Sequence, residues 1–316
     1  MSKLKGLLLT EGMHGMISQV EGLAKALDLD FIHEKIVINN FWKIIPPKFT
    51  PVQDFVFKNK ISNDFNIVIS CGRKSVIPSI YLKKKLKEKI MNIHIQDPKV
   101  SLSNFDYIVA PEHDGLIGSN VLQSKGAIHY LRDNELNENK SYLKSKINKK
   151  KVVSFIVGGP NKYYNYADDI IDVIFSKVKK NFIDNDYQLI FIPSMRTPQN
   201  IINKAKEYFD YNQIIVQDID KKAYLSSLEL ADHIVVTCDS TSMISEAAIT
   251  GKPIYVAQMP NIKKNDRFQK FFQLFNSLNI IKNLENSVEK WSYKKLNETE
   301  RISSYIKDQL KNYDFS

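Results

Sequence analysis

A run of hydroxyl side chains follows a strand-like apolar stretch in residues 235–256, VVTCDSTSMISEAAITGKPIYV. A turn of this kind, opening a short helix, presents hydroxyls and backbone N–H groups where an anion such as a diphosphate binds favourably. One helical turn further on, the carboxylate of Glu246 could bind ribose hydroxyls. A phosphate binder followed by a diol binder indicates a nucleotide that carries a sugar. The alternative interpretation is an ordinary helix–strand unit with a good N-cap.

Two further loops in the second half of the chain also contain residues suited to bind a phosphate, and each loop follows a strand-like stretch. The glycines of Gly158–Asn161 let backbone approach a ligand closely, and Arg196 adds a cation that could stabilise a leaving diphosphate. Only five of the 45 basic residues are arginines, which favours a geometric role for Arg196. No DxD pair indicates a metal, and no cofactor is expected beyond a UDP-sugar as substrate. The predicted nucleotide-sugar site comprises Gly158, Gly159, Asn161, Ser194, Arg196, Thr197, Ser240, Thr241, Ser242 and Glu246.

Candidate groups for acid–base chemistry lie in the first half, again after strand-like stretches. His14 follows the first strand, in TEGMHG, where the glycine spacing does not fit a dinucleotide-binding GxGxxG. An imidazole or carboxylate there could deprotonate a sugar hydroxyl, although helix and turn capping is the alternative for each residue. The predicted catalytic residues are His14, Asp97 and Asp114. The predicted acceptor-binding residues are Gly12, Gly15, Gln19, Arg73, Gln96 and His113.

Composition narrows the class of protein. A chain of 316 residues with 43% hydrophobic content can form two cores, and no apolar run is long enough to span a membrane. The opening apolar run breaks at Thr10–Gly12, which predicts a strand rather than a signal peptide. Cys71 and Cys238 are expected to be free buried thiols in a reducing compartment, hence a cytoplasmic location that includes the inner face of the membrane.

The net charge of +10 comes mainly from lysine and is attributed to compositional bias. Residues 83–89 are expected to form a solvated helix face and residues 146–151 a linker. Neither run interleaves aromatic residues, so specific nucleic-acid binding is not expected. Peripheral contact with an acidic membrane surface stays open as a further partner.

Strand-like stretches alternate with helical periods in two series, and the polar residues 136–151 are expected to be the linker between them. This alternation predicts an α/β protein with two Rossmann-like domains facing a central cleft, the GT-B-like architecture. Residues 1–145 are expected to form the acceptor-side domain and 151–297 the nucleotide-side domain. A helix in 298–316 is expected to cross back to the first domain.

Taken in order, these motifs resemble the mitochondrial fission ELM-type family, from the first strand to about Phe268. The resemblance implies a GT-B-like fold. It also implies kinship with bacterial members regarded as nucleoside-diphosphate-sugar enzymes, and with a plant adaptor that recruits a dynamin-related GTPase to the mitochondrial outer membrane. The motifs that carry it are Gln19–Ala24, Ser70–Arg73, Gln96–Pro98, Pro111–Asp114, Gly158–Pro160, Ser194–Pro198 and Val236–Ala247.

Three functions are compatible with these residues. The first is a glycosyltransferase that passes a sugar from a nucleotide to an acceptor that the sequence does not identify. The second is a nucleoside-diphosphate-sugar 2-epimerase, for which His113 and Asp114 would matter more. The third is a non-catalytic adaptor that binds a protein partner.

Overall fold

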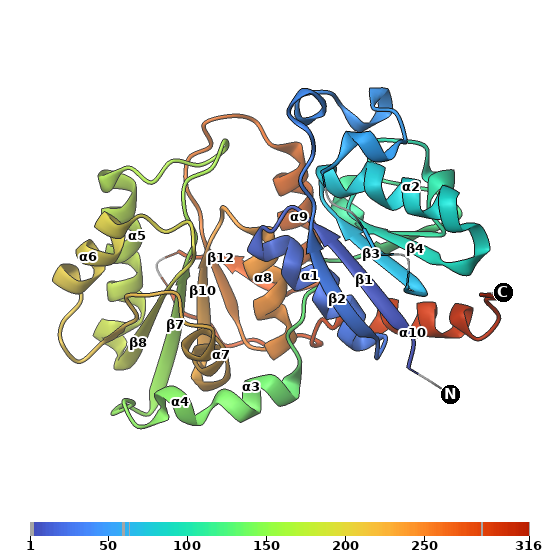
Figure 1. Cartoon of the computed structure of the whole chain (residues 1–316). Coiled ribbons are helices and arrows are strands. Elements are labelled where there is room, and N and C mark those ends of the chain that lie inside the picture. The colour runs from blue at the N-terminus through green and yellow to red at the C-terminus, as the bar shows by residue number, and fades with distance from the viewer. Residues whose placement is uncertain (1–2, 59–60, 63, 286, 316) are drawn as a thin grey trace. The chain divides into compact units, whose positions relative to one another are not determined.

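The computed structural model describes residues 3–58, 61–62, 64–285 and 287–315, and it divides into two compact units. Unit 1 comprises Met1–Tyr130 with Asn297–Ser316, and unit 2 comprises Leu131–Leu296. Each unit is built on a six-stranded parallel sheet with helices packed against it (Figure 1). The predicted α/β class is therefore confirmed, and each unit is Rossmann-like.

Unit 1 has the strand order β2-β1-β3-β4-β5-β6. Its inner strands are short apolar runs because helices bury both faces of a parallel sheet. Its strands are β1 (Lys5–Thr10), β2 (Asp30–Lys35), β3 (Ile67–Cys71), β4 (Met91–Ile95), β5 (Tyr107–Pro111) and β6 (Val121–Ser124). Its α-helices are α1 (His14–Ala26), α2 (Val76–Leu86) and α10 (Glu298–Leu310).

Alternate strand residues of unit 1 enter two different apolar cores. Leu8 belongs to the core with α1 and α10, whereas its neighbours Leu7 and Leu9 belong to the core with α2. This alternation follows from the two-residue period of a strand. Helix α10 contributes Ile302 and Ile306 to the first of these cores, so it is an integral part of unit 1.

Unit 2 has the strand order β12-β11-β10-β7-β8-β9, which is the order of a dinucleotide-binding Rossmann sheet. Its strands are β7 (Lys151–Val157), β8 (Tyr187–Pro193), β9 (Ile214–Ile215), β10 (His233–Thr237), β11 (Ile254–Ala257) and β12 (Ile281–Asn283). Its α-helices are α3 (Asp133–Asn139), α4 (Ser141–Lys144), α5 (Asp168–Asn181), α6 (Gln199–Tyr208), α7 (Lys221–Leu230), α8 (Thr241–Ala247) and α9 (Asp266–Ser277).

The predicted linker at 136–151 is wrong. Helices α3 and α4 occupy half of it and pack against α7, with Leu136 and Leu143 buried. The amide of Leu143 also donates to Ser226 Oγ at 3.1 Å. Because both helices pack on α7, they belong to unit 2, which begins at Leu131, and the boundary predicted after residue 145 is too late.

The lysine run at 83–89 is only partly the solvated face that was predicted. Lys83 is half-buried, and its Nζ lies 2.9 Å from Asp106 and donates to Tyr313 Oη at 2.8 Å. Among the described residues, no helix combines the length and the hydropathy needed to cross a bilayer.

Candidate functional site

The candidate site of unit 2 lies at the carboxyl ends of β7 and β10. These strands are neighbours, and the strand order reverses between them. Ligands of open α/β sheets bind at such a switch point, beyond the carboxyl ends of the strands. The residues that follow here are Gly158 and Gly159 after β7, and Cys238 and Asp239 after β10.

Asp239 is the central hydrogen-bond acceptor at this switch point, and its side chain is fully buried. Its Oδ1 accepts from Tyr166 Oη at 2.5 Å and from Thr237 Oγ1 at 2.7 Å. Its Oδ2 accepts from Arg196 at 2.7 Å and from the amide of Gly159 at 3.1 Å. Burial and the adjacent carboxylate raise the pKa of Tyr166, which keeps its hydroxyl a donor. These four donors satisfy both oxygens of the buried carboxyl group.

The two glycines are required by close packing around Asp239. A Cβ on Gly158 would lie 2.2 Å from Asp239 Oδ2, and one on Gly159 would lie 1.9 Å from the carbonyl oxygen of Arg196. Glycine here lets the backbone approach the Asp239–Arg196 ion pair. Whether it also lets a phosphate approach stays a prediction.

Arg196 makes two hydrogen bonds through its guanidinium, and its side chain is partly exposed. One guanidinium nitrogen donates to Asp239, and a second donates to the carbonyl of Gly159 at 2.8 Å. These contacts use two of its five N–H donors, and 39% of its side chain is exposed. The guanidinium is therefore fixed in orientation by two acceptors, and the side chain as a whole is partly exposed.

The other predicted donor-site residues have local structural contacts. Thr197 Oγ1 lies 2.7 Å from the carbonyl of Gly158 and accepts from the amide of Ser194 at 2.8 Å. Ser240 is the N-cap of α8 and accepts from Met243, while Thr241 and Ser242 are half-buried in the first turn. Asn161 donates to the carbonyl of Asp239 at 3.1 Å.

Glu246 has a definite neighbour of its own. Tyr224 Oη donates to Glu246 Oε2 at 2.8 Å, and the carboxylate is half-buried on α8. The contact orients the carboxylate, and its second oxygen has acceptor capacity of its own. Binding of a ribose by Glu246 stays a prediction.

In unit 1 the strand order reverses between β1 and β3, and Glu11 stands at that point. Its carboxylate accepts from the backbone amide of Lys74 at 3.0 Å and lies 2.8 Å from Lys74 Nζ. His14, Gly12 and Gly15 are exposed around it, with His14 at the first position of α1.

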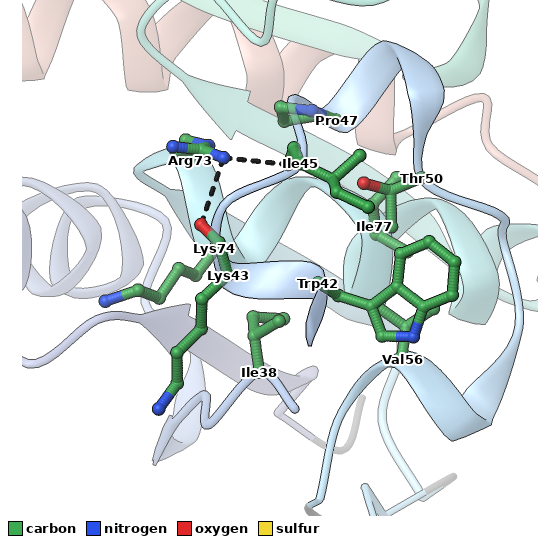
Figure 2. A pocket seen from close by; sticks show the side chains of 10 residues that line it. All are labelled: Ile38, Trp42, Lys43, Ile45, Pro47, Thr50, Val56, Arg73, Lys74 and Ile77. Carbon is green, nitrogen blue, oxygen red and sulfur yellow. Dashed lines mark hydrogen bonds between the residues drawn. The ribbon is translucent and has the colours of Figure 1, made fainter. Parts of the chain in front are cut away.

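Gln19 and Arg73, both predicted to bind an acceptor, have structural partners. The buried amide of Gln19 donates to the carbonyl of Gly15 at 3.0 Å. Arg73 donates to the carbonyls of Lys43 at 3.1 Å and Ile45 at 2.7 Å, which ties the segment after β2 to the start of α2. Figure 2 shows Arg73 at the rim of a pocket whose lining includes Trp42.

Two further loops of unit 1 hold the remaining candidates. Asp97 accepts from the amide of Lys99 at 2.9 Å and pairs with its Nζ at 2.5 Å, a turn-capping arrangement. Gln96, just before it, has φ of 81°, an uncommon conformation for a non-glycine residue. After β5, His113 Nε2 lies 3.7 Å from Asp114 Oδ1, and both side chains are largely buried.

The structure thus brings together Gly158, Gly159, Asn161, Arg196 and Thr197, which contact one another or Asp239. Sequence reasoning missed the organising residues Asp239, Tyr166 and Glu11. An acidic residue directly after an apolar strand was the available signal for Asp239 and Glu11. Within the described ranges, no group of three or more His, Cys, Asp or Glu side chains is placed to hold a metal ion.

Known structures with the same architecture identify the class of fold. The UDP-GlcNAc 2-epimerase of Methanocaldococcus jannaschii is 13% identical, with a TM-score of 0.52 over 96% of this chain and 99% of that one. The UDP-GlcNAc 2-epimerase of Neisseria meningitidis bound to UDP-GlcNAc is 12% identical, with a TM-score of 0.53 over 98% of this chain and 100% of that one. S. aureus MnaA, in a co-structure with UDP, is 15% identical, with a TM-score of 0.53 over 99% of this chain and 98% of that one. The fold is GT-B-like.

Sequence comparison gives the family. The family model for mitochondrial fission ELM1 matches residues 14–310, and the chain belongs to that family. An uncharacterised protein of Rickettsia prowazekii is 28% identical over 78% of this chain and 80% of its own length. The mitochondrial fission protein ELM1 of Arabidopsis thaliana is 25% identical over 77% of this chain, and the match spans 64% of the Arabidopsis protein.

Proposed function

We propose that unit 2 binds a nucleotide-sugar, with a UDP-sugar as the expected class, and that the protein transfers the sugar to an acceptor. The observation that carries the proposal is Arg196, which stands beside the switch point of a dinucleotide-type sheet, fixed by Asp239 and 39% exposed. A pre-oriented guanidinium is suited to bind a diphosphate and to stabilise it as a leaving group. The similar proteins of S. aureus and N. meningitidis, whose structures contain UDP and UDP-GlcNAc, support this choice of ligand.

Within this proposal, Ser240, Thr241 and Ser242 bind phosphate oxygens and Glu246 binds the ribose hydroxyls. The Tyr224 contact holds the Glu246 carboxylate in one orientation. For the base that activates the acceptor, His14 comes first because its side chain is exposed at the start of α1. Asp97 and Asp114 follow, since each already contacts a neighbouring side chain.

The test is binding of UDP, GDP, CDP, ADP and their sugar conjugates to the full chain, by thermal shift and calorimetry. One nucleotide should raise the melting temperature. Glu246→Gln keeps an acceptor for Tyr224 but loses the charge, so affinity should fall about tenfold. Glu207→Gln, on the exposed face of α6, is the matched control and should bind like the wild type. If no nucleotide binds, the proposal fails.

A 2-epimerase is the second candidate, favoured by the similarity to UDP-GlcNAc 2-epimerases at TM-scores above 0.5. Epimerisation exchanges a ring proton with solvent, whereas simple transfer does not. NMR of the product formed in deuterated water separates the two reactions. Incorporation of deuterium at the epimerised carbon would show that the reaction is epimerisation and not sugar transfer.

A non-catalytic adaptor is the third candidate, favoured by membership of the mitochondrial fission ELM1 family. It predicts that Glu246→Ala and Arg196→Ala leave partner binding intact, provided that the variants fold. Absence of nucleotide binding in the calorimetric test would move the assignment to this candidate.

A further inference from the structure

The segment between β2 and β3, residues 36–58, presents an unusual concentration of apolar side chains to solvent. It contains Phe41, Ile44 and Phe49, which are 65%, 79% and 67% exposed. Phe55 and Val37 add two more exposed apolar side chains. Single exposed apolar residues are ordinary on protein surfaces, but several in one short segment mark an interaction site.

The 36–58 segment is held rigidly on unit 1. It forms three short 3-10 helices at Asn40–Lys43, Pro47–Phe49 and Asp54–Val56. Its buried side chains, including Val56 and Phe57, belong to the core beneath α2. Arg73 clamps it through the two carbonyl contacts drawn in Figure 2. The exposed side chains are therefore displayed by a folded support.

The 36–58 segment carries both aromatic rings and lysines. Phe41 packs edge-on against Trp42 at 4.8 Å between ring centroids, and Trp42 lies 6.1 Å from Phe55. Lys48 Nζ stands 4.6 Å from the centre of the Phe49 ring. The 36–58 segment has three lysines, at 43, 48 and 58, and one acidic residue, Asp54. The segment therefore combines exposed apolar side chains with a net positive charge.

We propose that the 36–58 segment docks unit 1 onto a membrane surface that contains anionic lipids. Exposed aromatic rings insert favourably at the boundary of headgroups and acyl chains, and flanking lysines pair with anionic headgroups. A net charge of +10 on the whole chain adds long-range attraction to such a surface. The charge complementarity selects a lipid surface over a second copy of this chain, whose own 36–58 segment would repel it. The proposal does not depend on the nucleotide-sugar proposal.

The experiment is cosedimentation of the full chain with vesicles of phosphatidylcholine, alone or mixed with phosphatidylglycerol. The chain should bind the anionic vesicles, and high salt should weaken the binding because lysine–headgroup attraction is screened. The paired change Phe41→Ser with Phe49→Ser should lower the partition coefficient by about tenfold or more. The paired change Lys43→Glu with Lys48→Glu should lower it by a similar factor, about tenfold or more.

Matched controls carry the same kinds of change elsewhere. Val173→Ser with Tyr211→Ser removes exposed apolar groups of unit 2, and Lys179→Glu with Lys180→Glu reverses charges on α5. Both should bind vesicles like the wild type, and circular dichroism should show all four variants folded.

Three outcomes would overturn the proposal. The first is no binding to anionic vesicles. The second is an equal loss of binding in the control variants, which would assign it to overall charge. The third is a wild-type dimer in light scattering that the phenylalanine changes dissociate without any vesicle binding, which would assign the surface to a second copy.

Discussion

At the scale of single residues, the contacts of Asp239 stabilise the fold and also orient Arg196, the residue proposed to bind a diphosphate. One buried carboxylate fixes a tyrosine, a glycine loop and an arginine at a strand switch point. A charge buried in this way destabilises the fold unless its donors are all in place. The residues that would orient Arg196 toward a diphosphate therefore also connect the loops that follow β7 and β10.

Gly158→Ala should destabilise the protein by about 1–3 kcal/mol, because the added methyl group cannot be accommodated without displacing Asp239. The matched control is Gly15→Ala, where a Cβ meets nothing within 4 Å in the first turn of α1. That change should leave stability unchanged or slightly raised, because alanine favours a helix over glycine. Urea unfolding of both variants is the measurement, and equal effects would contradict the close-packing explanation.

Lys252 should make stability depend on pH in the alkaline range. Burial lowers the pKa of Lys252 from 10.5 to about 8, against the opposing effect of Glu229. Between those values the unfolded chain binds more protons than the folded one, so this residue's contribution to stability rises with pH. Relative to Lys252→Met, the wild type should gain about 2 kcal/mol between pH 7.5 and pH 9.5. Urea unfolding at both pH values tests this, and an unchanged difference would contradict it.

At the scale of elements, the alternation of strand-like and helical stretches predicted the α/β class and the two parallel sheets. It did not reveal three edge strands: β2, whose DFIHEK sequence is half-exposed, and the short strands β6 and β12, whose burial patterns are mixed. Edge strands give a weak signal because only part of each is buried. Periodicity also could not reveal Asp239 as the central acceptor, because its partners Tyr166 and Arg196 are far away in sequence.

Helix α10 should be essential to unit 1, although it is separated from β6 by the whole of unit 2. Ile306 is fully buried in the core that contains Leu23 of α1. Ile306→Ala should therefore cost about 2–5 kcal/mol of unfolding free energy, whereas Ser304→Ala on the exposed face should cost little. Chemical denaturation of the full chain provides the comparison. A near-neutral Ile306→Ala would show that α10 is not part of this core.

At the scale of the whole molecule, unit 2 is an insertion in unit 1. The two stretches of unit 1 meet where His129 and Thr299 exchange two hydrogen bonds, at 3.0 and 2.8 Å. Close to the first and last residues of unit 2, Lys295 Nζ lies 2.8 Å from the Asp133 carboxylate. Each unit therefore has its own core and closely spaced ends.

This arrangement predicts that the units can be separated. Residues 131–296 should fold alone, and residues 1–130 should fold when a short Gly/Ser linker joins them to 297–316. Residues 1–130 without α10 should be much less stable, because one helix of the core is missing. Circular dichroism melts of the three fragments test this. A cooperative melt of 1–130 alone, equal to that of the linked version, would contradict it.

The insertion also has a consequence for the order of events during synthesis. Residues 131–296 emerge from the ribosome ahead of α10, so the inserted unit can begin to fold while the first sheet still lacks one of its helices. Until then, the apolar patch on α1 that receives Ile302 and Ile306 stays open to solvent and to other nascent chains. Between the folding of unit 2 and the docking of α10 on unit 1, the nascent protein is most exposed to aggregation and most dependent on chaperones.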